Sequence, residues 1–539
     1  MEWTGAGTNA QRTQTEASST LASDWSANTE DKSGLAPGLF ASFKPRINFQ
    51  SDKKTMSNEI RNLEPKAVWN NFAILNAVPR PSKKEDKVRK LMVDFGENLN
   101  LETLVDPVGN VIIKKPASRG MENRKTIVMQ SHLDMVCQKN SDTDFDFDSQ
   151  GIKMLVDGDW VKAEGTTLGA DNGLGVASIM SVLESDDIIH SAIEALFTID
   201  EETGMTGAIG LQAGYLDGEI LLNLDTEEDD EIGVGCAGGI DISAFRTYEP
   251  IETPDKVKAF RITLTGLRGG HSGMDIHRGF GNANKLMNRI LFALDDSISV
   301  SEIDGGGLRN AIPRESSALL VCDNEEKVKA LFSQISSEIK NEYQSIEQGL
   351  EILLEPADVP DTVLSPIEQG NLVKSIYAIH NGVFRMSPDI EGLVETSNNL
   401  SRVLLKEGEI KISCLCRSSV DSGKMDLANH IKSGLELGGF KVELSGSYPG
   451  WEPNPDSEIL QVLEGIYENV FGKKPQVLAC HAGLECGILG THYPEMDMIS
   501  FGPTIKGAHS PDERASITST QKYWKFLLEV LKNIPVIEA

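Results

Sequence analysis

Histidine and carboxylate residues follow several apolar runs of this sequence. The stretch "VMQSHLDMV" places His132 and Asp134 two residues apart, which puts them on the same side of an extended chain. The glycine-rich "TTLGADNGLG" carries Asp171 in a turn before a helix, and "FTIDEETGM" ends an apolar run in three acidic residues. The set is completed by Glu201 and Glu202 in that third stretch, Asp225 in "LLNLDTEED" and His509 in "SFGPTIKGAHSPDE". Imidazole and carboxylate groups are the ligands of many catalytic zinc sites.

Each of these residues, taken singly, has an ordinary structural explanation. An aspartate at a strand end is usually a cap or a turn former, and two adjacent glutamates are usually solvated. The recurrence of charge after apolar runs is what favours chemistry, because desolvated carboxylates are unfavourable unless they are paired or bind a metal. The first four stretches contain no lysine or arginine. We therefore predict a site for two divalent metal ions, best suited to zinc, with cobalt or manganese as alternatives.

The two adjacent glutamates of the third stretch are expected to have different roles. Glu201 and Glu202 cannot easily both reach one ion from an extended segment, so one would bind metal while the other accepts a proton from water. An aspartate that bridges the two ions would hold them about 3.5–4 Å apart, the spacing of two-metal hydrolases. Asp134 is placed to orient the imidazole of His132. The chemistry that this set predicts is hydrolysis.

Alternating strands and helices must position these side chains. The stretches "GNVIIKKP", "KTIVMQSHLDMV", "EALFTIDEE" and "EILLNLDTEE" predict strands, and residues 85–99 and 173–185 predict helices between them. This alternation indicates an α/β sheet covered by helices. In such sheets ligands bind beyond the carboxyl ends of the strands, where the candidate residues gather.

The pattern of predicted strands and helices changes after "GCAGGIDISAF". Strands such as "KAFRITLTGL", "SALLVCD" and "EIKISCLCRS" frame predicted helices at 281–295 and 325–347, which indicates an inserted α+β domain. The turn-rich "GSYPGWEPNPDS" leads back to the α/β pattern. We predict a disordered extension at 1–57, a catalytic domain formed by 58–238 and 446–539, and an inserted domain at 239–445.

Composition excludes several classes of partner. The formal net charge of −30 argues against nucleic acid and anionic membrane surfaces, and no apolar run approaches the roughly 20 residues of a membrane span. Seven scattered cysteines favour a reducing compartment, hence the cytoplasm, and the Cys414-x-Cys416 pair fits an ordinary strand. The extension lacks the apolar region of a secretory signal, and its acidic residues are unusual for a transit peptide. Met56 is a possible alternative start.

Nine motifs in this order identify a family resemblance over residues 58–539. They are "HLDMV", "GTTLGADNGLG", "DEETGMTGA", "NLDTEE", "GCAGGID", "GGHSGMDIHRGFGNANK", "LRNAIPRE", "HAGLECG" and "FGPTIKGAHSPDE". Together they closely resemble the aminoacyl-histidine dipeptidase (Xaa-His dipeptidase) branch of the M20 metallopeptidases. The resemblance implies a di-metal catalytic domain with an inserted lid domain that also carries dimerisation. It implies hydrolysis of Xaa-His dipeptides, including β-alanyl-histidine.

The resemblance also implies a role for each candidate residue. Asp171 would bridge the metals, and a cis peptide is expected between it and Asn172. His132 and Asp225 would complete one metal site, and Glu202 and His509 the other. Glu201 would be the general base and Asp134 the residue that orients His132.

The remaining roles implied by the resemblance concern the substrate. His271 of "GGHSG" would polarise the scissile carbonyl, often from the neighbouring subunit. Asn310 and Arg417 would bind the substrate near its carboxylate end, for which an arginine fork is suited. His481 and Glu485 of "HAGLECG" would lie in a loop that contacts the substrate.

Other functions remain as alternatives. A serine or cysteine hydrolase is disfavoured because "GGHSG" is not a G-x-S-x-G motif and because Cys137 and His132, five residues apart, need not meet. A dinucleotide-binding enzyme is disfavoured because "GLGVAS" lacks a clean acidic partner downstream. A metal-dependent scaffold without activity would not need a base such as Glu201. Within the family, a broad-specificity dipeptidase or an N-acyl amino acid hydrolase is the alternative to Xaa-His cleavage.

Overall fold

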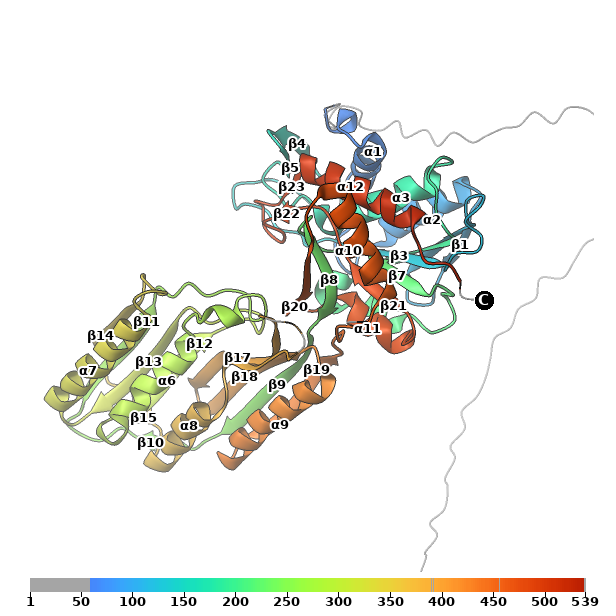
Figure 1. Cartoon of the computed structure of the whole chain (residues 1–539). Coiled ribbons are helices and arrows are strands. Elements are labelled where there is room, and N and C mark those ends of the chain that lie inside the picture. The colour runs from blue at the N-terminus through green and yellow to red at the C-terminus, as the bar shows by residue number, and fades with distance from the viewer. Residues whose placement is uncertain (1–58, 389, 391, 455, 538–539) are drawn as a thin grey trace, which may run out of the picture. The chain divides into compact units, whose positions relative to one another are not determined.

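The structure of the chain is a computed structural model that describes residues 59–537 except 389, 391 and 455. The predicted disorder of residues 1–57 therefore falls outside the described residues. The described residues form two large sheets with covering helices, one sheet with parallel strands at its centre and one antiparallel, which confirms the mixed α/β class (Figure 1). Among the described residues, no helix has the length and apolar character needed to span a membrane.

The first large sheet has eight strands. Their order is β1 (Glu102–Val105), β2 (Val111–Lys115), β6 (Ile193–Thr198), β3 (Ile127–His132), β7 (Ile220–Asn223), β21 (Asp497–Ser500), β8 (Glu231–Cys236) and β20 (Gln476–Cys480). β3 pairs in parallel with both β6 and β7, and β7 with β21. Every residue of β3, β6 and β7 is buried, as expected for parallel strands that are covered on both faces.

Helices from both ends of the chain pack on this sheet. They are η1 (Ile60–Asn62), α1 (Lys66–Leu75), α2 (Asp86–Asn98), α3 (Ala170–Glu184), α4 (Glu201–Gly204), α5 (Thr206–Gly210), α10 (Glu458–Phe471), α11 (Glu485–His492) and α12 (Ile517–Lys532). Val176, Ile179 and Met180 of α3 share a buried apolar core with Met129 of β3 and Phe526 of α12. Regular helical geometry in α3 begins at residue 173, as predicted, because Asp171 and Asn172 have non-helical backbone angles.

A four-stranded sheet flanks the first. Its order is β22 (Ile505–Lys506), β23 (Arg514–Ser516), β5 (Trp160–Ala163) and β4 (Met154–Asp157). The loop between β22 and β23 carries His509, and the pairing of β23 with β5 ties this loop to an earlier part of the chain.

The second large sheet is antiparallel and comes from the inserted segment. Its order is β14 (Glu351–Ala357), β11 (Lys258–Thr265), β13 (Ser316–Cys322), β12 (Ser299–Gly306), β17 (Val394–Lys406), β18 (Glu409–Ser418), β9 (Gly238–Thr247) and β19 (Lys441–Tyr448), with β16 (Gly382–Met386) also on β17. β10 (Ile251–Glu252) and β15 (Thr362–Val363) form a small separate ribbon.

Four helices cover one face of this antiparallel sheet (Figure 1). They are α6 (Ala283–Leu294), α7 (Glu325–Tyr343), α8 (Pro366–Ala378) and α9 (Asp421–Leu437), with the short η2 (Ile276–Arg278) and η3 (Asp295–Ser297) nearby in the chain. Their apolar faces share one buried core with the sheet. The helices predicted at 281–295 and 325–347 are α6 and α7. The strands change sheet between Cys236 and Gly238, and β19 extends to Tyr448.

Candidate metal centre and active site

The candidate residues lie at the carboxyl ends of neighbouring strands. His132 is the last residue of β3, and Asp225 follows β7 by two residues. Glu201 and Glu202 open α4, just after β6. Because β3 lies between β6 and β7 and is parallel to both, these ends meet at one edge of the sheet. The sheet topology therefore gathers residues that are up to 93 positions apart.

Asp171 stands between the two histidines. The Nε2 atom of His132 lies 3.3 Å from Oδ1 of Asp171 and 3.6 Å from Oδ1 of Asp225. The Nε2 atom of His509 lies 3.2 Å from Oδ2 of Asp171 and 3.0 Å from Oε2 of Glu202. Each oxygen of Asp171 thus faces a different imidazole. The peptide bond between Asp171 and Asn172 is cis, as expected.

These contacts define two groups of ligand atoms that share one residue. His132, Asp171 and Asp225 form one group, and Asp171, Glu202 and His509 form the other, with the ligand atoms of each group within 4.8 Å of one another. His132, Glu201 and Glu202 satisfy the same criterion. The residue types and the shared aspartate fit a pair of divalent ions.

The bonding within the cluster supports this fit. Within the described part of the chain, the ion pairs of Asp171, Glu202 and Asp225 are with His132 and His509. The Oε1 atom of Glu202 is buried and has no hydrogen-bond partner there. A buried carboxylate oxygen without a donor is unfavourable, and a cation would satisfy it.

The pKa shifts show how strongly the cluster attracts positive charge. Burial opposes the charged form of His132, but Asp225, Asp134 and Asp171 outweigh burial and raise the pKa of its imidazole well above the usual value. Hydrogen bonds to Asp171 and Glu202 raise the pKa of His509 to about 11. Without metal ions, both imidazoles are therefore protonated and supply positive charge to the cluster. Bound divalent cations would supply that positive charge instead.

Asp134 connects His132 to the loop of the two glutamates. Its Oδ1 atom lies 3.3 Å from Nδ1 of His132 and accepts the N–H of Glu201 at 3.0 Å. Its Oδ2 atom accepts the N–H of Glu202 at 3.2 Å and the hydroxyl of Ser82 at 2.7 Å. The side chain has no exposed surface. One buried carboxylate thus lies against the imidazole of His132 and binds the backbone N–H groups of both glutamates.

Glu201 faces the same cluster without a hydrogen bond to the imidazole. Its Oε2 atom lies 4.0 Å from Nε2 of His132. Burial, opposed in part by His132 and reinforced by Asp225 and Glu202, raises the pKa of Glu201 well above the usual value. A glutamate with a raised pKa is suited to accept and return a proton.

Comparison with known proteins identifies the family of this chain. Residues 128–533 match the model of peptidase family M20/M25/M40. The cytosol non-specific dipeptidase of Escherichia coli is 43% identical over 482 residues, which cover 89% of this chain and 99% of that protein. The chain belongs to peptidase family M20/M25/M40. It is therefore a peptide hydrolase, and the resemblance inferred from the nine motifs is confirmed.

Two solved structures share the fold of this chain. The aminoacylhistidine dipeptidase of Vibrio alginolyticus has a TM-score of 0.82 and is 44% identical, covering 89% of this chain and 99% of that one. The aminopeptidase PepT of Bacillus cereus has a TM-score of 0.52 at 15% identity, with coverage of 87% and 98%, and shows the same fold.

In this M20 chain the inserted segment brings a second set of predicted residues together. The Nδ1 atom of His271 accepts the N–H groups of Gly273 at 3.3 Å and Met274 at 3.1 Å, so the ring proton belongs on Nε2. Burial and the charge of Arg417 lower the pKa of His271 to about 4, which keeps the ring neutral at physiological pH. A Cβ added at Gly273 would collide with the carbonyl oxygen of His481.

Arg417 and His481 are held by buried contacts. The Nη1 atom of Arg417 donates to the hydroxyl of Tyr448 at 3.0 Å, and its Nε donates to the hydroxyl of Ser272 at 3.3 Å. The Nε2 atom of His481 lies 2.7 Å from the hydroxyl of Ser397. Burial and the charge of Arg417 lower the pKa of His481 to about 3.

The other two predicted substrate residues are placed differently. Asn310 meets this region through its backbone, because its carbonyl accepts the N–H of Ser272 at 2.8 Å. Glu485 starts α11 and has no exposed surface. Its Oε2 atom accepts the amide of Gln130 and the hydroxyl of Thr198, both at 2.6 Å, and burial raises its pKa to about 8. The substrate roles of both residues stay predictions.

Sequence reasoning missed several buried groups around the cluster. Glu85 and Asp200, which were not predicted, form a further buried carboxylate group with the predicted Asp134, and Oε1 of Glu85 accepts the N–H of Asp200 at 3.0 Å. Arg80 and Glu513 lie against the turn that carries Asp171. The one available signal was the position of Glu513, four residues after His509 in "HSPDE".

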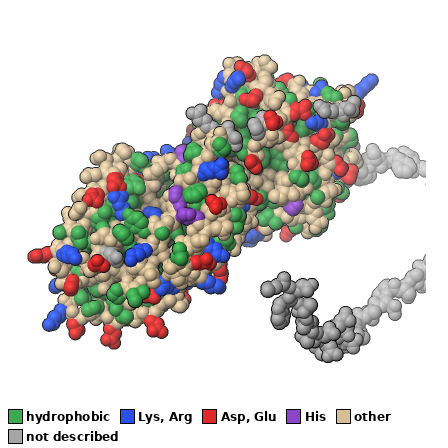
Figure 2. Space-filling view, turned by 60° about the horizontal axis from the view of Figure 1, so that its bottom comes forward, with side chains coloured by type: hydrophobic (Ala, Val, Ile, Leu, Met, Phe, Trp, Pro, Cys, Tyr) green, Lys and Arg blue, Asp and Glu red, His purple; other side chains and the backbone are tan. Residues whose placement is uncertain are grey.

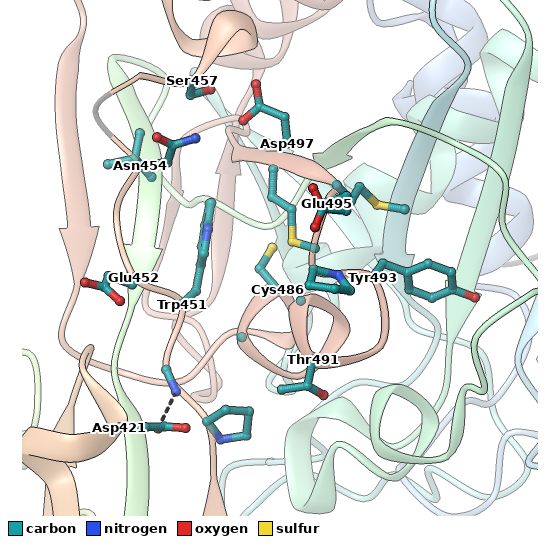
Figure 3. Close-up of a pocket in the computed structure, with 18 residues that line it drawn as sticks. Asp421, Trp451, Glu452, Asn454, Ser457, Cys486, Thr491, Tyr493, Glu495 and Asp497 are labelled. Carbon is teal, nitrogen blue, oxygen red and sulfur yellow. Dashed lines mark hydrogen bonds between the residues drawn. The ribbon is translucent and has the colours of Figure 1, made fainter.

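A cavity of about 480 Å³ lies apart from these residues. Figure 3 shows it between Trp451, Glu452, Cys486, Tyr493 and Glu495, and none of the predicted site residues lines it. The side-chain geometry, and not this cavity, therefore defines the candidate site. On the face shown in Figure 2, acidic and basic side chains are interspersed.

Proposed function

We propose that this M20 peptidase is a dipeptidase that uses two divalent cations. The carrying observation is that two ligand groups share Asp171, while Glu201 lies beside them with a raised pKa. His132 and Asp225 would hold one ion, and Glu202 and His509 the other. Zinc is the proposed metal, with cobalt or manganese as alternatives, because this set mixes imidazole and carboxylate ligands.

The residues of the chain have distinct proposed roles in peptide hydrolysis. Bound divalent ions would make a water molecule acidic and polarise the scissile carbonyl. Glu201 accepts the proton of the attacking water and passes it to the leaving amine. Asp134 holds the imidazole of His132 in its ligating orientation. His271 donates a hydrogen bond from Nε2 to the oxygen of the tetrahedral intermediate, and the pKa of about 4 keeps that donor neutral.

We propose that the inserted segment selects the substrate and that residues 239–445 form a lid through which two copies associate. The guanidinium of Arg417 would bind the terminal carboxylate of a dipeptide, and its bonds to Tyr448 and Ser272 support a fixed orientation. Residues 58–238 and 446–539 would form the catalytic domain. A cytoplasmic location is proposed because the seven cysteines are free and the E. coli relative is named for the cytosol.

Xaa-His dipeptides, including β-alanyl-histidine, are the proposed preferred substrates. The name of the Vibrio relative supports this preference, while the name of the E. coli relative supports a broad dipeptidase as the second candidate. Both candidates use the same metal centre and differ in the pocket for the C-terminal side chain. An N-acyl amino acid hydrolase would share the chemistry but not the need for a free amino group.

Hydrolysis of a substrate panel tests the proposal. The panel contains β-alanyl-histidine, Ala-His, Gly-His, Ala-Ala and N-acetyl-alanine, assayed before and after chelation and after return of zinc, cobalt or manganese. Loss of cleavage on chelation and its return with metal are expected, with the three histidine dipeptides cleaved fastest. Cleavage of Ala-Ala as fast as that of the histidine dipeptides would contradict the Xaa-His preference and support a broad dipeptidase. Folded, metal-loaded protein that cleaves nothing in the panel would contradict the dipeptidase.

The variant Glu201→Gln separates metal binding from catalysis. Glutamine keeps the size of the side chain but cannot accept the proton, so kcat should fall by about 10²- to 10⁴-fold. The metal content, measured by elemental analysis, should stay at the wild-type value. A variant that keeps its activity would show that Glu201 is not the base.

A further inference from the structure

Glu513 is a buried carboxylate that binds only main-chain N–H groups among its described hydrogen bonds. Its Oε2 atom accepts the N–H of Leu168 at 2.7 Å and that of Gly169 at 2.9 Å. Its Oε1 atom accepts the N–H of Ala170 at 2.7 Å and that of Asp171 at 3.3 Å. The side chain is 2% exposed. Four successive amides therefore converge on one anion, and the last belongs to the shared aspartate of the cluster.

The turn that Glu513 binds lacks a cap of its own. Gly169 is the N-cap residue of α3 and has φ of 70°, a left-handed conformation that glycine adopts readily. It has no side chain to satisfy the free N–H groups at the start of the helix. A carboxylate at this positive end is favourable. Glu513 supplies this cap from a segment more than 340 residues later in the chain.

The same five-residue segment contacts Asp171 twice. His509 begins the segment and meets the Oδ2 atom of Asp171 at 3.2 Å, and Glu513 ends it and meets the backbone N–H of Asp171. β23 follows at once and pairs with β5, which fixes the base of the loop. The carboxylate and the backbone N–H of Asp171 thus both contact one loop, whose base is fixed by the pairing of β23 with β5.

Arg80 holds the opposite side of the same turn. Its Nη2 atom donates to the carbonyl of Gly169, and its Nη1 donates to the carbonyls of Leu133 at 3.1 Å and Asp134 at 2.9 Å. The side chain is 1% exposed. Leu133 and Asp134 directly follow His132. Arg80 therefore ties the turn before Asp171 to the segment that carries the other imidazole.

We infer that Glu513 is a positioning residue which, together with Arg80, fixes Asp171 relative to His132 and His509 for the binding of two metal ions. A helix cap alone would need only a short polar side chain such as serine or aspartate next to the helix in sequence. Burial of a carboxylate and a guanidinium is unfavourable unless hydrogen bonds compensate for it. The hydrogen bonds of Glu513 and of the two Nη atoms of Arg80 join the segments that carry three proposed ligands, whereas Nε of Arg80 has no partner among the described residues. The inference rests on the proposed metal centre.

The variant Glu513→Gln tests this role. Glutamine has nearly the same shape, but one end of it is an NH₂ donor that would face two of the four N–H groups. Zinc affinity is measured by competition with a chromogenic chelator, and the cobalt-loaded protein by its visible absorption spectrum. We expect a zinc affinity about 10- to 100-fold lower than in the wild type, and a changed cobalt spectrum. Asp512→Asn is the matched control, because it removes one exposed carboxylate from the adjacent residue and should leave both readouts unchanged.

Two further measurements separate the possible outcomes. A Glu513→Gln protein that unfolds more easily when metal-free, but binds zinc with wild-type affinity and gives the wild-type cobalt spectrum, would reduce Glu513 to a structural cap and overturn the inference. If Glu513→Gln does not fold, Glu513→Asp carries the test: it keeps the charge but is one methylene shorter, so several-fold weaker zinc binding is expected and wild-type affinity overturns the inference. A wild-type protein that binds no zinc would instead refute the metal centre itself.

Discussion

At the scale of single residues, charge balance decides what each side chain of the cluster can do. Asp171 offers one oxygen to His132 and the other to His509, so both imidazoles depend on its exact placement. Glu202 keeps one buried oxygen free of hydrogen bonds among the described residues. The contacts around Arg417 and His481 differ, because their partners are uncharged hydroxyl groups. Arg417 donates to Tyr448, and His481 lies against the hydroxyl of Ser397. The proposed metal site and the proposed substrate site thus have different electrostatic environments.

His481 gives a prediction about acid stability. Burial, followed by the charge of Arg417, lowers its pKa to about 3. The unfolded chain would take up a proton near the ordinary value of about 6.5, so stability falls as the pH drops from there towards the folded pKa. Between about pH 7.5 and about pH 5 this residue should remove about 2 kcal/mol of folding stability.

Urea unfolding of metal-free protein at these two pH values provides the measurement. Over this range, His481→Gln should lose about 2 kcal/mol less stability than the wild type, because glutamine does not titrate. His430→Gln, at an exposed histidine on α9, should behave like the wild type. Identical losses for wild type and His481→Gln would show that His481 binds its proton equally in the folded and unfolded chains.

Residues of the cluster could be predicted from sequence because each is a side chain with its own motif. His132, Glu202, Asp225 and His509 are expected after apolar stretches and Asp171 in a turn before a helix, and the structure brings their ligand atoms together. Glu513 and Arg80 could not be predicted in the same way. Apart from the side chain of Asn76, to which Arg80 also donates, their hydrogen-bond partners are backbone N–H and C=O groups, which nearly every residue has and which leave no mark in the sequence.

At the scale of elements, the strands that position the cluster were the most predictable part of the fold. β3, β6 and β7 are buried along their whole length, and each contains a short apolar run: "IVM" in β3, "ALF" in β6 and "ILL" in β7. The antiparallel β18 matches its predicted stretch at both ends, Glu409–Ser418. The strand order could not be predicted, because the insertion of β21 between β7 and β8 depends on pairing between distant segments.

The packing of α3 on the sheet gives a second prediction. A Cβ at Gly175 would lie 2.6 Å from the carbonyl oxygen of Leu224 and would also collide with the side chains of Ser131 and Asn172. Ser131 precedes His132, and Asn172 follows Asp171. Gly175→Ala should therefore push α3 away from β3, lower the unfolding free energy by about 1–3 kcal/mol and reduce zinc occupancy.

A second helical glycine provides the matched control for this prediction. Gly465 lies in α10, and a Cβ added there would meet no atom within 4 Å. Gly465→Ala should raise the unfolding free energy by about 0.4–1 kcal/mol and leave zinc occupancy unchanged. Chemical unfolding and elemental analysis of both variants provide the comparison. Wild-type stability and zinc occupancy in Gly175→Ala would show that α3 tolerates a wider spacing from the sheet.

At the scale of the whole molecule, the proposed base and the proposed carbonyl donor come from different sheets. Glu201 follows β6 of the mostly parallel sheet, whereas His271 follows β11 of the antiparallel one. The family resemblance predicts that His271 serves the site of the neighbouring subunit. Co-expression of Glu201→Gln with His271→Ala, carrying different purification tags, would isolate the mixed dimer.

The two models of the dimer give opposite results for this mixed species. If His271 acts across the interface, one of its two sites has both groups intact, and about half of the wild-type kcat per dimer is expected. If His271 acts within its own subunit, both sites are impaired and the mixed dimer should be as inactive as its parents. A mass measurement by light scattering establishes whether the dimer forms, and a monomer would contradict the proposed association.

The position of β21 also determines when this protein can become active during its synthesis. β7 ends at Asn223, but β21, which completes its pairing, begins at Asp497, roughly 270 residues later. A ribosome needs about 15 to 55 s to add a segment of that length. The nascent chain must therefore expose the edge of β7 throughout this interval, and His509 emerges only at its end. The proposed metal centre, which includes His509, is thus complete only when translation is almost finished.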